Sequence, residues 1–482
     1  MEVMVLAVAR VRFLDKDEVE FVHEQSVKSL EDIGVLVRSH KVLNSLREIG
    51  CSVDLKSGVA KIPEKIVNEA IRKAPREIRL CARDPKHDMP IPVESSPYIG
   101  TTGLGIYMRD IDTGQKRPST RKDIADIVRL ADALDPVGYC WTTLTAGEVN
   151  QKAHGLHELW TAFQNTTKHV QSVEVSSIED SRAQVKLAAL VAGGEKELRK
   201  RPLFSVICCS IAPLSFDETA VEGMAELAKH GIPVASMSMS LSGGSAPVTV
   251  AGTVVNANTE NLASLVITQF TAPGAPHIYC SSSAPIDMRT GSINYMTAEP
   301  AVISASLGQM AEKYRLPSMV GDWGLNDNEE PGIPHSITQI TGVFLTTMSG
   351  TDIAGGMGGL DAVKGASLEQ LVIDAYLWED LRAYMRRFTF DEQTAALDVV
   401  KAVGHGNTFL THPHTLKNFK KELHFWDPAK LAWESSLSSK MVPEARKVAK
   451  DLLKSHHVPP LDKGALQKGD EIIKAYEKTA TR

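Results

Sequence analysis

The chain has 482 residues, of which 43% are apolar and 23% are charged, so it can bury a large core and exceeds the roughly 150 residues of an average domain. Its formal net charge of -6 is small for this length, which excludes a strongly basic nucleic-acid-binding face and an acidic tail. Six cysteines occur without C-x-x-C spacing, so we expect reduced thiols in a cytoplasmic protein rather than a disulfide scaffold.

The first 96 residues are predicted to form a helical N-terminal extension. The apolar run after Met1 is far shorter than the roughly 20 residues of a membrane span, and Arg10 and Arg12 follow it, so we expect neither a span nor a signal peptide. Apolar residues recur at helical spacing from Asp15 to Leu80, and the segment KIPEKIVNEAIRKAP carries a proline suited to the first turn of a helix.

Residues 97–388 alternate between short β-rich runs and longer amphipathic stretches, which is typical of repeated βα units. The predicted strands are Tyr98–Leu104, Gly138–Thr145, Lys168–Val175, Leu203–Ser210, Pro233–Ser240, His277–Ser283, Ser318–Asp322 and Asp352–Met357. The predicted helices are Thr120–Leu134, His154–Asn165, Ile178–Ala192, Phe216–His230, Thr249–Phe270, Ala298–Arg315, His335–Met348 and Ser367–Arg387.

Eight strand and helix pairs in about 290 residues predict an α/β protein with one (β/α)8 TIM barrel and helical extensions at both ends. The rival, a doubly wound open sheet, would carry G-x-G-x-x-G after its first strand, and that motif is absent there.

Residues 389–482 are predicted to form a C-terminal helical cap. No further strand is expected after Arg387, and the predicted helices are Glu392–Val403, Thr415–Leu423, Ala429–Leu437 and Pro443–Ser455. Barrels with helical extensions at both ends often self-associate, so we expect a homo-oligomer.

The active site of a TIM barrel lies in the loops that follow the strands. Here these loops are rich in Gly, Ser, Thr, Met and aromatic residues and poor in His, Cys and carboxylates, so we predict no metal centre. No lysine ends a strand, which argues against a Schiff-base aldolase. Among the histidines, His335 in the long loop after the seventh strand is the best site candidate.

Aromatic and acidic residues share this rim. Tyr107, Trp141 and Trp323 follow the first, second and seventh strands, and Glu174 and Asp322 add negative charge. Aromatic faces near a carboxylate suit a quaternary ammonium ion, each close contact contributing on the order of 0.5–2 kcal/mol. For each aromatic residue, a purely structural packing role is an equal alternative.

Two glycine-rich loops, Gly243–Gly244 and Gly355–Gly359, allow two interpretations. Their backbone N–H groups could bind a phosphate, as in many barrels. Alternatively, glycine lets crowded loops turn or lets another molecule approach the backbone closely.

Five segments in order carry a family resemblance: PREIRLCARDP, SGGSAPVTVAGTVVNANTENLA, APIDMRTG, GASLEQLVIDAYLWE and GNTFLTHPHTLKNFKKEL. Together they resemble the trimethylamine methyltransferase superfamily, which includes glycine betaine and other quaternary-amine demethylases. The resemblance extends from about Asp15 to Leu453.

This resemblance implies a TIM-barrel enzyme that moves a methyl group from an amine to the Co(I) of a separate corrinoid protein. The sequence contains no D-x-H-x-x-G corrinoid motif, so the cobalamin is expected on a partner that docks over the barrel mouth. The residues expected to face that corrinoid are Gly243, Gly244, Gly355 and Gly356.

The trimethylamine branch of the family carries pyrrolysine, whereas every residue here is an ordinary amino acid, which shifts the expected substrate to a quaternary amine such as a betaine. A quaternary ammonium leaves as a neutral amine and needs no acid catalyst, so no acid or base residue is assigned. The substrate-binding residues expected are Tyr107, Trp141 and Trp323 for the ammonium, Glu174 or Asp322 for its charge, and His335 with Arg289 or Asn326 for a carboxylate.

Two other functions remain open from the sequence alone. The glycine loops would suit a phosphate-binding lyase or isomerase, and a protein that kept the fold without the chemistry would bind quaternary amines without turnover. We expect neither a nucleic acid nor a membrane as partner.

Overall fold

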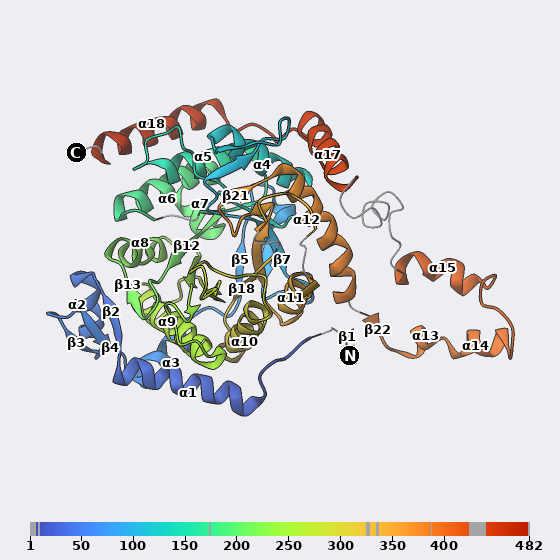
Figure 1. The fold of residues 1–482 in the computed structure, drawn as a ribbon, viewed down its shortest axis with the longest axis horizontal. Helices are drawn as coiled ribbons and strands as arrows, with labels where there is room; N and C mark the ends of the chain where they lie inside the picture. The colour runs from blue at the N-terminus through green and yellow to red at the C-terminus, as the bar shows by residue number, and fades with distance from the viewer. Residues whose placement is uncertain are drawn as a thin grey trace.

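The computed structural model describes residues 6–7, 10–172, 175–323, 328–333, 337–386, 388–423 and 440–480. Its centre is a closed barrel of eight parallel strands, which confirms the predicted fold (Figure 1). In barrel order these are β7 (Tyr98–Thr101), β10 (Tyr139–Trp141), β11 (His169–Ser172), β12 (Phe204–Cys209), β14 (Val234–Ser238), β16 (His277–Ser281), β18 (Ser318–Asp322) and β19 (Ile353–Met357).

A ring of helices surrounds the barrel, and seven of the eight predicted helices have bounds within two residues of the prediction (Figure 1). The helices of the ring are α4 (Arg121–Ala133), α5 (His154–Asn165), α6 (Ile178–Ala192), α8 (Glu218–Lys229), α9 (Val250–Thr271), α10 (Glu299–Tyr314), α11 (Ile337–Met348) and α12 (Leu368–Leu381), with a short α7 (Glu195–Lys200) after α6. The eighth predicted helix, α12, ends at Leu381, six residues before the predicted Arg387. Side-chain caps such as Thr120 and Ser177 fix where α4 and α6 begin.

A buried lysine ties one of these helices to the barrel. The ammonium of Lys168 donates to the backbone carbonyls of Ala131, Leu134 and Val137 at distances of 2.8, 2.8 and 2.6 Å. These carbonyls lie at and after the C-terminal end of α4, where the helix leaves acceptors unsatisfied and carries partial negative charge. Burial lowers the pKa of Lys168.

The N-terminal extension contains helices, as predicted, and also short strands, which were not predicted. The helices are α1 (Lys16–Asp32), α2 (His40–Glu48), α3 (Glu64–Lys73) and the 3-10 turn η1 (Pro85–His87). The strands β2 (Val35–Val37), β3 (Ser52–Asp54) and β4 (Val59–Lys61) form a sheet with β13 (Ser215–Phe216). They are too short for a period-two pattern to stand out beside helical spacing.

A hairpin closes the N-terminal end of the barrel. Strands β5 (Ile78–Leu80) and β6 (Met89–Ile91) pair antiparallel, and their apolar side chains are buried in one cluster with the barrel interior. The backbone N–H of Cys81 donates to the carbonyl of Pro202, just before β12, and Val93 donates to the Asp352 carboxylate, just before β19. These contacts place the hairpin under the strand beginnings.

The C-terminal part differs from the prediction in two ways. A short strand β22 (Phe388–Thr389) follows Arg387 and pairs with β1 (Leu6–Ala7). The predicted helix Glu392–Val403 is two helices, α13 (Glu392–Ala395) and α14 (Leu397–Val403), because Ala396 between them adopts a φ of 49°. The helix predicted over Ala429–Leu437 lies outside the described residues.

The remaining C-terminal elements are η2 (Arg382–Met385), α15 (Pro413–Glu422), α17 (Met441–Ser455) and α18 (Lys463–Ala480). Helix α18 was not predicted, and it packs against α5 and α6. A Cβ on Gly469 of α18 would lie only 2.1 Å from Trp160 of α5, so this close approach requires glycine.

Candidate functional site

Two aromatic rings from one strand fill part of the barrel interior. Tyr139 and Trp141 of β10 both point inward, where a Cβ on Gly100 would lie 2.5 Å from Tyr139 and one on Gly355 would lie 2.6 Å from Trp141. The Tyr139 hydroxyl donates to the carbonyl of Ala354 at 2.9 Å. The two glycines therefore make room for the two rings, and Trp141 is 7% exposed.

A chain of hydrogen bonds beside these rings fixes a buried amide. His169 Nδ1 lies 2.8 Å from the carbonyl of Cys81, which can only accept, so Nδ1 is the donor. Burial lowers the pKa of His169 to about 4, so the ring is neutral and its Nε2 accepts from Ser205 Oγ at 2.9 Å. Ser205 Oγ in turn accepts from Gln171 Nε2 at 3.2 Å, which leaves Gln171 Oε1 facing away from the serine.

Two polar atoms on neighbouring barrel strands then lack a partner in the described structure. They are Nε1 of Trp141, a donor, and Oε1 of Gln171, an acceptor. Trp141 and Gln171 are directly paired in register on β10 and β11, and Gln171 is fully buried. Buried polar groups are nearly always hydrogen-bonded, so this pair is a candidate contact for a bound group or water that supplies an acceptor and a donor or positively polarised surface.

A small sheet beside the mouth carries Tyr107. The strands β8 (Tyr107–Arg109), β9 (Lys116–Pro118), β20 (Gly359–Leu360) and β21 (Gly365–Ala366) form this sheet from the loops after β7 and β19. The Tyr107 hydroxyl donates to Asp361 at 3.4 Å, and the Lys116 ammonium lies 3.9 Å from the centre of the ring. Burial and the Asp361 charge raise the pKa of Tyr107.

Tyr107, Lys116 and Asp361 also line a surface pocket of about 290 Å³. The face of Tyr107 is thus in contact with an ammonium of the protein itself, in the geometry of a cation–π contact. An external quaternary ammonium would have to displace Lys116 to use this ring.

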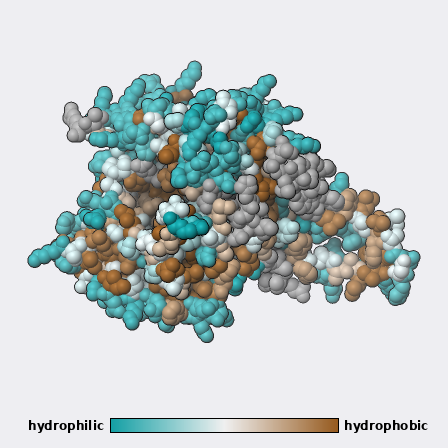
Figure 2. Space-filling view, viewed as in Figure 1, coloured by the Kyte–Doolittle hydropathy of each residue, from teal (hydrophilic) through white to brown (hydrophobic). Residues whose placement is uncertain are grey.

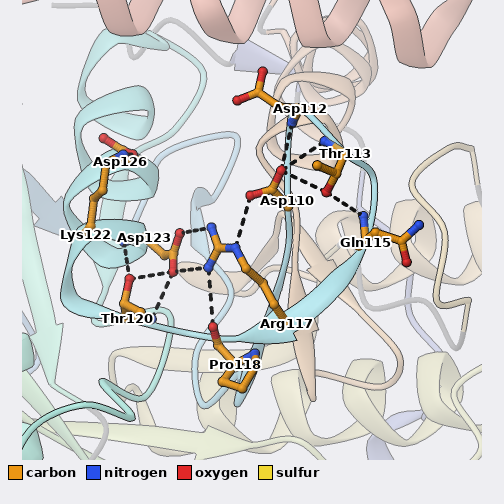
Figure 3. Close-up of polar contacts among 10 residues, drawn as sticks. All are labelled: Asp110, Asp112, Thr113, Gln115, Arg117, Pro118, Thr120, Lys122, Asp123 and Asp126. Carbon is orange, nitrogen blue, oxygen red and sulfur yellow. Dashed lines mark hydrogen bonds and ion pairs between the residues drawn. The ribbon is translucent and has the colours of Figure 1, made fainter.

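An arginine bridge holds the sheet in place (Figure 3). Arg117 on β9 donates to Asp110 at 3.1 Å and to both oxygens of Asp123 on α4 at 2.7 and 2.8 Å. The N–H of Thr113, followed by the Arg117 guanidinium, lowers the pKa of Asp110. Because Arg117 joins the hairpin turn to the first turn of α4, Tyr107 is held at a fixed position on the rim.

Two buried carboxyl groups under the rim were missed by the sequence reasoning. Glu260 of α9 accepts from Ser210 Oγ and Ser238 Oγ at 2.6 Å each, and from the backbone N–H of Leu214 at 2.8 Å. Burial raises its pKa. It is the single charged residue in the sequence of α9, and that isolation was the available signal.

The second is Asp374 of α12. It accepts from the backbone N–H of Gly358 and from Gln370 Nε2, both at 2.8 Å, and burial raises its pKa to about 7. Gln370 Oε1 also accepts from the N–H of Gly332 at 2.8 Å. Asp374 and Gln370 therefore connect the loop after β19 to residues 328–333, which follow β18.

The predicted substrate-binding residues have varied surroundings. Glu174, Asn326 and His335 lie outside the described residues, and Asp322 ends β18 with a side chain that is likewise not described. Trp323 packs against Trp378 of α12, with ring centres 4.9 Å apart, whereas Trp141 lies inside the barrel. The structure therefore does not bring Tyr107, Trp141 and Trp323 around one space.

Arg289 lies on the loop after β16, where it pairs with Asp287 at 2.7 Å and its side chain is 87% exposed. Its guanidinium is therefore already paired with a carboxylate two residues away, and among the described residues it makes no hydrogen bond or ion pair with the barrel strands. Its role in substrate binding stays a prediction.

The four predicted corrinoid-facing glycines are all in crowded places. Gly243 has a φ of 85° beside Met288, and a Cβ on Gly244 would lie 2.3 Å from Ile286. Gly356 has a φ of 137°, and a Cβ there would lie 1.8 Å from the carbonyl oxygen of Trp323. Backbone conformation or packing accounts for these glycines, so they give no separate support for a phosphate site.

The described residues contain no group of three His, Cys, Asp or Glu side chains that could hold a metal ion. None of the described helices has the length and hydropathy needed to cross a membrane.

Comparison with known proteins identifies relatives over nearly the whole chain. Residues 1–479 match the family model described as trimethylamine methyltransferase (MTTB). The trimethylamine methyltransferase of Methanosarcina barkeri is 32% identical over 470 residues, covering 96% of this chain and 94% of that protein. The glycine betaine methyltransferase of Desulfitobacterium hafniense is 28% identical and covers 94% of each chain.

Solved structures add a similarity of fold. The crystal structure of the Methanosarcina barkeri monomethylamine methyltransferase matches with a TM-score of 0.50 at 12% identity, covering 92% of this chain and 93% of that one.

Proposed function

Because this chain belongs to the trimethylamine methyltransferase family, we propose that it is a methyltransferase that moves a methyl group from a betaine-like quaternary amine to the Co(I) of a corrinoid on a separate protein. In this reaction the electron pair of Co(I) forms the new bond to carbon. The C–N bond breaks, its electron pair stays on nitrogen, and a neutral tertiary amine leaves. Cobalt is thereby oxidised to methyl-Co(III).

One observation carries this proposal. Two buried titratable side chains at the described part of the mouth, Glu260 and Asp374, are engaged in structural hydrogen bonds, and each accepts from two or more donors. A tertiary amine would need a proton to leave well, whereas a quaternary amine needs none. The site therefore fits a reaction that depends on positioning and desolvation of a cation.

The unpartnered atoms of β10 and β11 fit the two ends of a betaine. The Trp141 N–H can donate to a carboxylate, and the Gln171 carbonyl oxygen can face the methyl groups over which the ammonium charge is spread. The 28% identical glycine betaine methyltransferase supports the same class of substrate.

The rim offers an apolar surface for the protein that would deliver the corrinoid. Large exposed apolar side chains follow four of the barrel strands: Leu104 and Ile106 after β7, Ile211 after β12, Val248 after β14 and Met288 after β16. Contiguous exposed apolar side chains around a site are typical of protein contacts. We further propose that the protein is cytoplasmic, since none of its six cysteines forms a disulfide.

The test incubates the enzyme with a Co(I) corrinoid protein and a panel of betaines, choline, carnitine and trimethylamine, while the cobalt absorbance is followed. We expect methyl-Co(III) with at least one betaine and none with trimethylamine. Ligand binding without methyl-Co(III) would indicate a binding protein, and stabilisation by inorganic phosphate alone would indicate the lyase alternative; either result would overturn the proposal. The variant Val248→Asp with Met288→Asp should lower the rate while leaving betaine binding unchanged.

A further inference from the structure

Residues 388–423 form an arm that leaves the barrel and bears an unusual number of exposed apolar side chains. In Figure 1 the helices α13, α14 and α15 project from one side of the molecule, beyond the ring of barrel helices. The arm is anchored at its base, where β22 pairs with β1 and Arg386 donates to the carbonyl of Glu422 at 3.4 Å. It is therefore a hairpin of helices with an outgoing and a returning limb.

The arm is locally ordered but buries almost nothing. Asp391 caps α13, and Thr415 Oγ1 donates to the carbonyl of Phe409 at 2.7 Å. Within residues 388–423 only Ala396 and Val399 are buried, and α13, α14 and α15 have 4, 7 and 10 residues. Helices shorter than about 12 residues are marginal in water unless a packed face supports them.

About half of the large apolar side chains exposed in the described chain belong to this arm. They are Phe388, Phe390, Leu397, Val400, Phe409, Leu410, Leu416 and Leu423, with Phe390, Leu397, Leu410 and Leu416 each between 74% and 82% exposed. Figure 2 shows apolar side chains, in brown, on the projecting part at the right. A surface this apolar resembles the interface of a permanent oligomer rather than that of a transient complex.

The two limbs of the arm carry opposite charges. The outgoing limb, residues 391–403, carries Asp391, Glu392 and Asp398 with one lysine, whereas the returning limb, residues 413–422, carries Lys417, Lys420 and Lys421 with one glutamate. A two-fold axis places the same patch of two copies face to face. The acidic limb of one copy can then lie against the basic limb of the other.

We propose that the arm is the contact by which two copies of this chain assemble, with each arm packed on the arm of the other copy. The paired arms would bury the apolar side chains and match the opposite charges of the two limbs. This proposal does not depend on the reaction that the barrel catalyses.

The test measures the mass of the full-length protein in solution by light scattering and sedimentation. We expect an oligomer of the 52.4 kDa chain for the wild type and a dissociation constant raised on the order of 100-fold or more for the double variant Leu410→Asp with Leu416→Asp. The matched control is Phe21→Asp with Ile33→Asp, two similarly exposed apolar residues at α1, and it should keep the wild-type mass.

A second measurement uses the wild type alone and so does not depend on how the variants fold. Hydrogen exchange of residues 388–423 should speed up when the protein is diluted below the dissociation constant, while exchange in the barrel strands stays constant. A wild type that is monomeric at tens of micromolar, an arm variant with unchanged mass, or concentration-independent exchange in the arm would each overturn the proposal.

Discussion

The indole N–H of Trp141 allows a sharp test of how the barrel binds its substrate. Trp141→Phe keeps an aromatic ring against Gly355 but removes a donor that has no partner among the described residues. If that donor binds a substrate carboxylate, its loss removes a charge-assisted hydrogen bond of about 1.5–3 kcal/mol. At about 1.4 kcal/mol per factor of ten, the apparent affinity for a betaine should fall roughly 10- to 150-fold.

Stability should respond differently from affinity. In the substrate-free protein the buried unpaired N–H costs about 1–3 kcal/mol, and its removal offsets the packing lost with the smaller ring. We therefore expect little change in the free energy of unfolding, measured by urea titration, beside a large loss of affinity, measured by calorimetry.

The matched control is Trp323→Phe. Trp323 is equally buried and its N–H likewise lacks a partner, but it packs outside the barrel against Trp378. Its substitution should leave betaine affinity within about twofold. Equal losses in both variants, or an unchanged affinity in Trp141→Phe, would refute the assignment of the carboxylate to Trp141.

Three further predictions concern stability. Lys168→Met should lower the free energy of unfolding by about 3 kcal/mol, read from urea titration, because three carbonyls lose a charged donor; a change below about 1 kcal/mol would contradict this. Burial lowers the pKa of His169 to about 4 and that of His277 to about 3. Because these histidines become protonated at a higher pH in the unfolded chain than in the folded protein, stability is lost as pH falls below about 6.5. Between pH 7 and pH 5, each histidine should lower the free energy of unfolding by about 2 kcal/mol. The variant His277→Asn should therefore lose about 2 kcal/mol less than the wild type over this range, and parallel pH curves for variant and wild type would refute this. Gly356→Ala should unfold or misfold the protein, as judged by circular dichroism and soluble yield. Gly291→Ala, at a position that also has a positive φ (72°, against 137° at Gly356) but open space around it, should cost only about 1 kcal/mol.

The barrel could be predicted from the sequence because its strands are buried on both faces. Such strands appear as short continuous apolar or small-residue runs, and β16 and β18 begin at the residues predicted for them. The helices between them show the 3.6-residue period and recognisable caps, so their bounds were predicted to within a few residues.

Side-chain directions at the strand ends could not be predicted in the same way. Met319 faces the barrel interior, and strict alternation would turn Trp323 inward too. The pairing of β18 with β19 shifts register between Met319 and Asp322, and Gly321 has a φ of 89°. This irregularity sends Trp323 outward to Trp378, and no pattern in a single sequence indicates it.

For the arm, the sequence predicts helices but not the surface against which they pack. Its helical spacing was visible in GNTFLTHPHTLKNFKKEL, but spacing tells which residues share a face and not what covers that face. Gln171 was missed for a related reason, since an amide inside a strand gives no sign in the sequence that one of its two polar atoms will lack a partner.

The hairpin of β5 and β6 has a kinetic consequence. With the N-terminal end of the barrel closed by buried side chains such as Leu80 and Met89, small molecules reach the interior through the opposite end, where the methyl acceptor would also sit. For the reaction proposed above, the amine must then enter before the acceptor protein docks, and the demethylated amine can depart only after that protein has left. Steady-state kinetics should accordingly show a compulsory order, with excess acceptor protein inhibiting by trapping the empty enzyme.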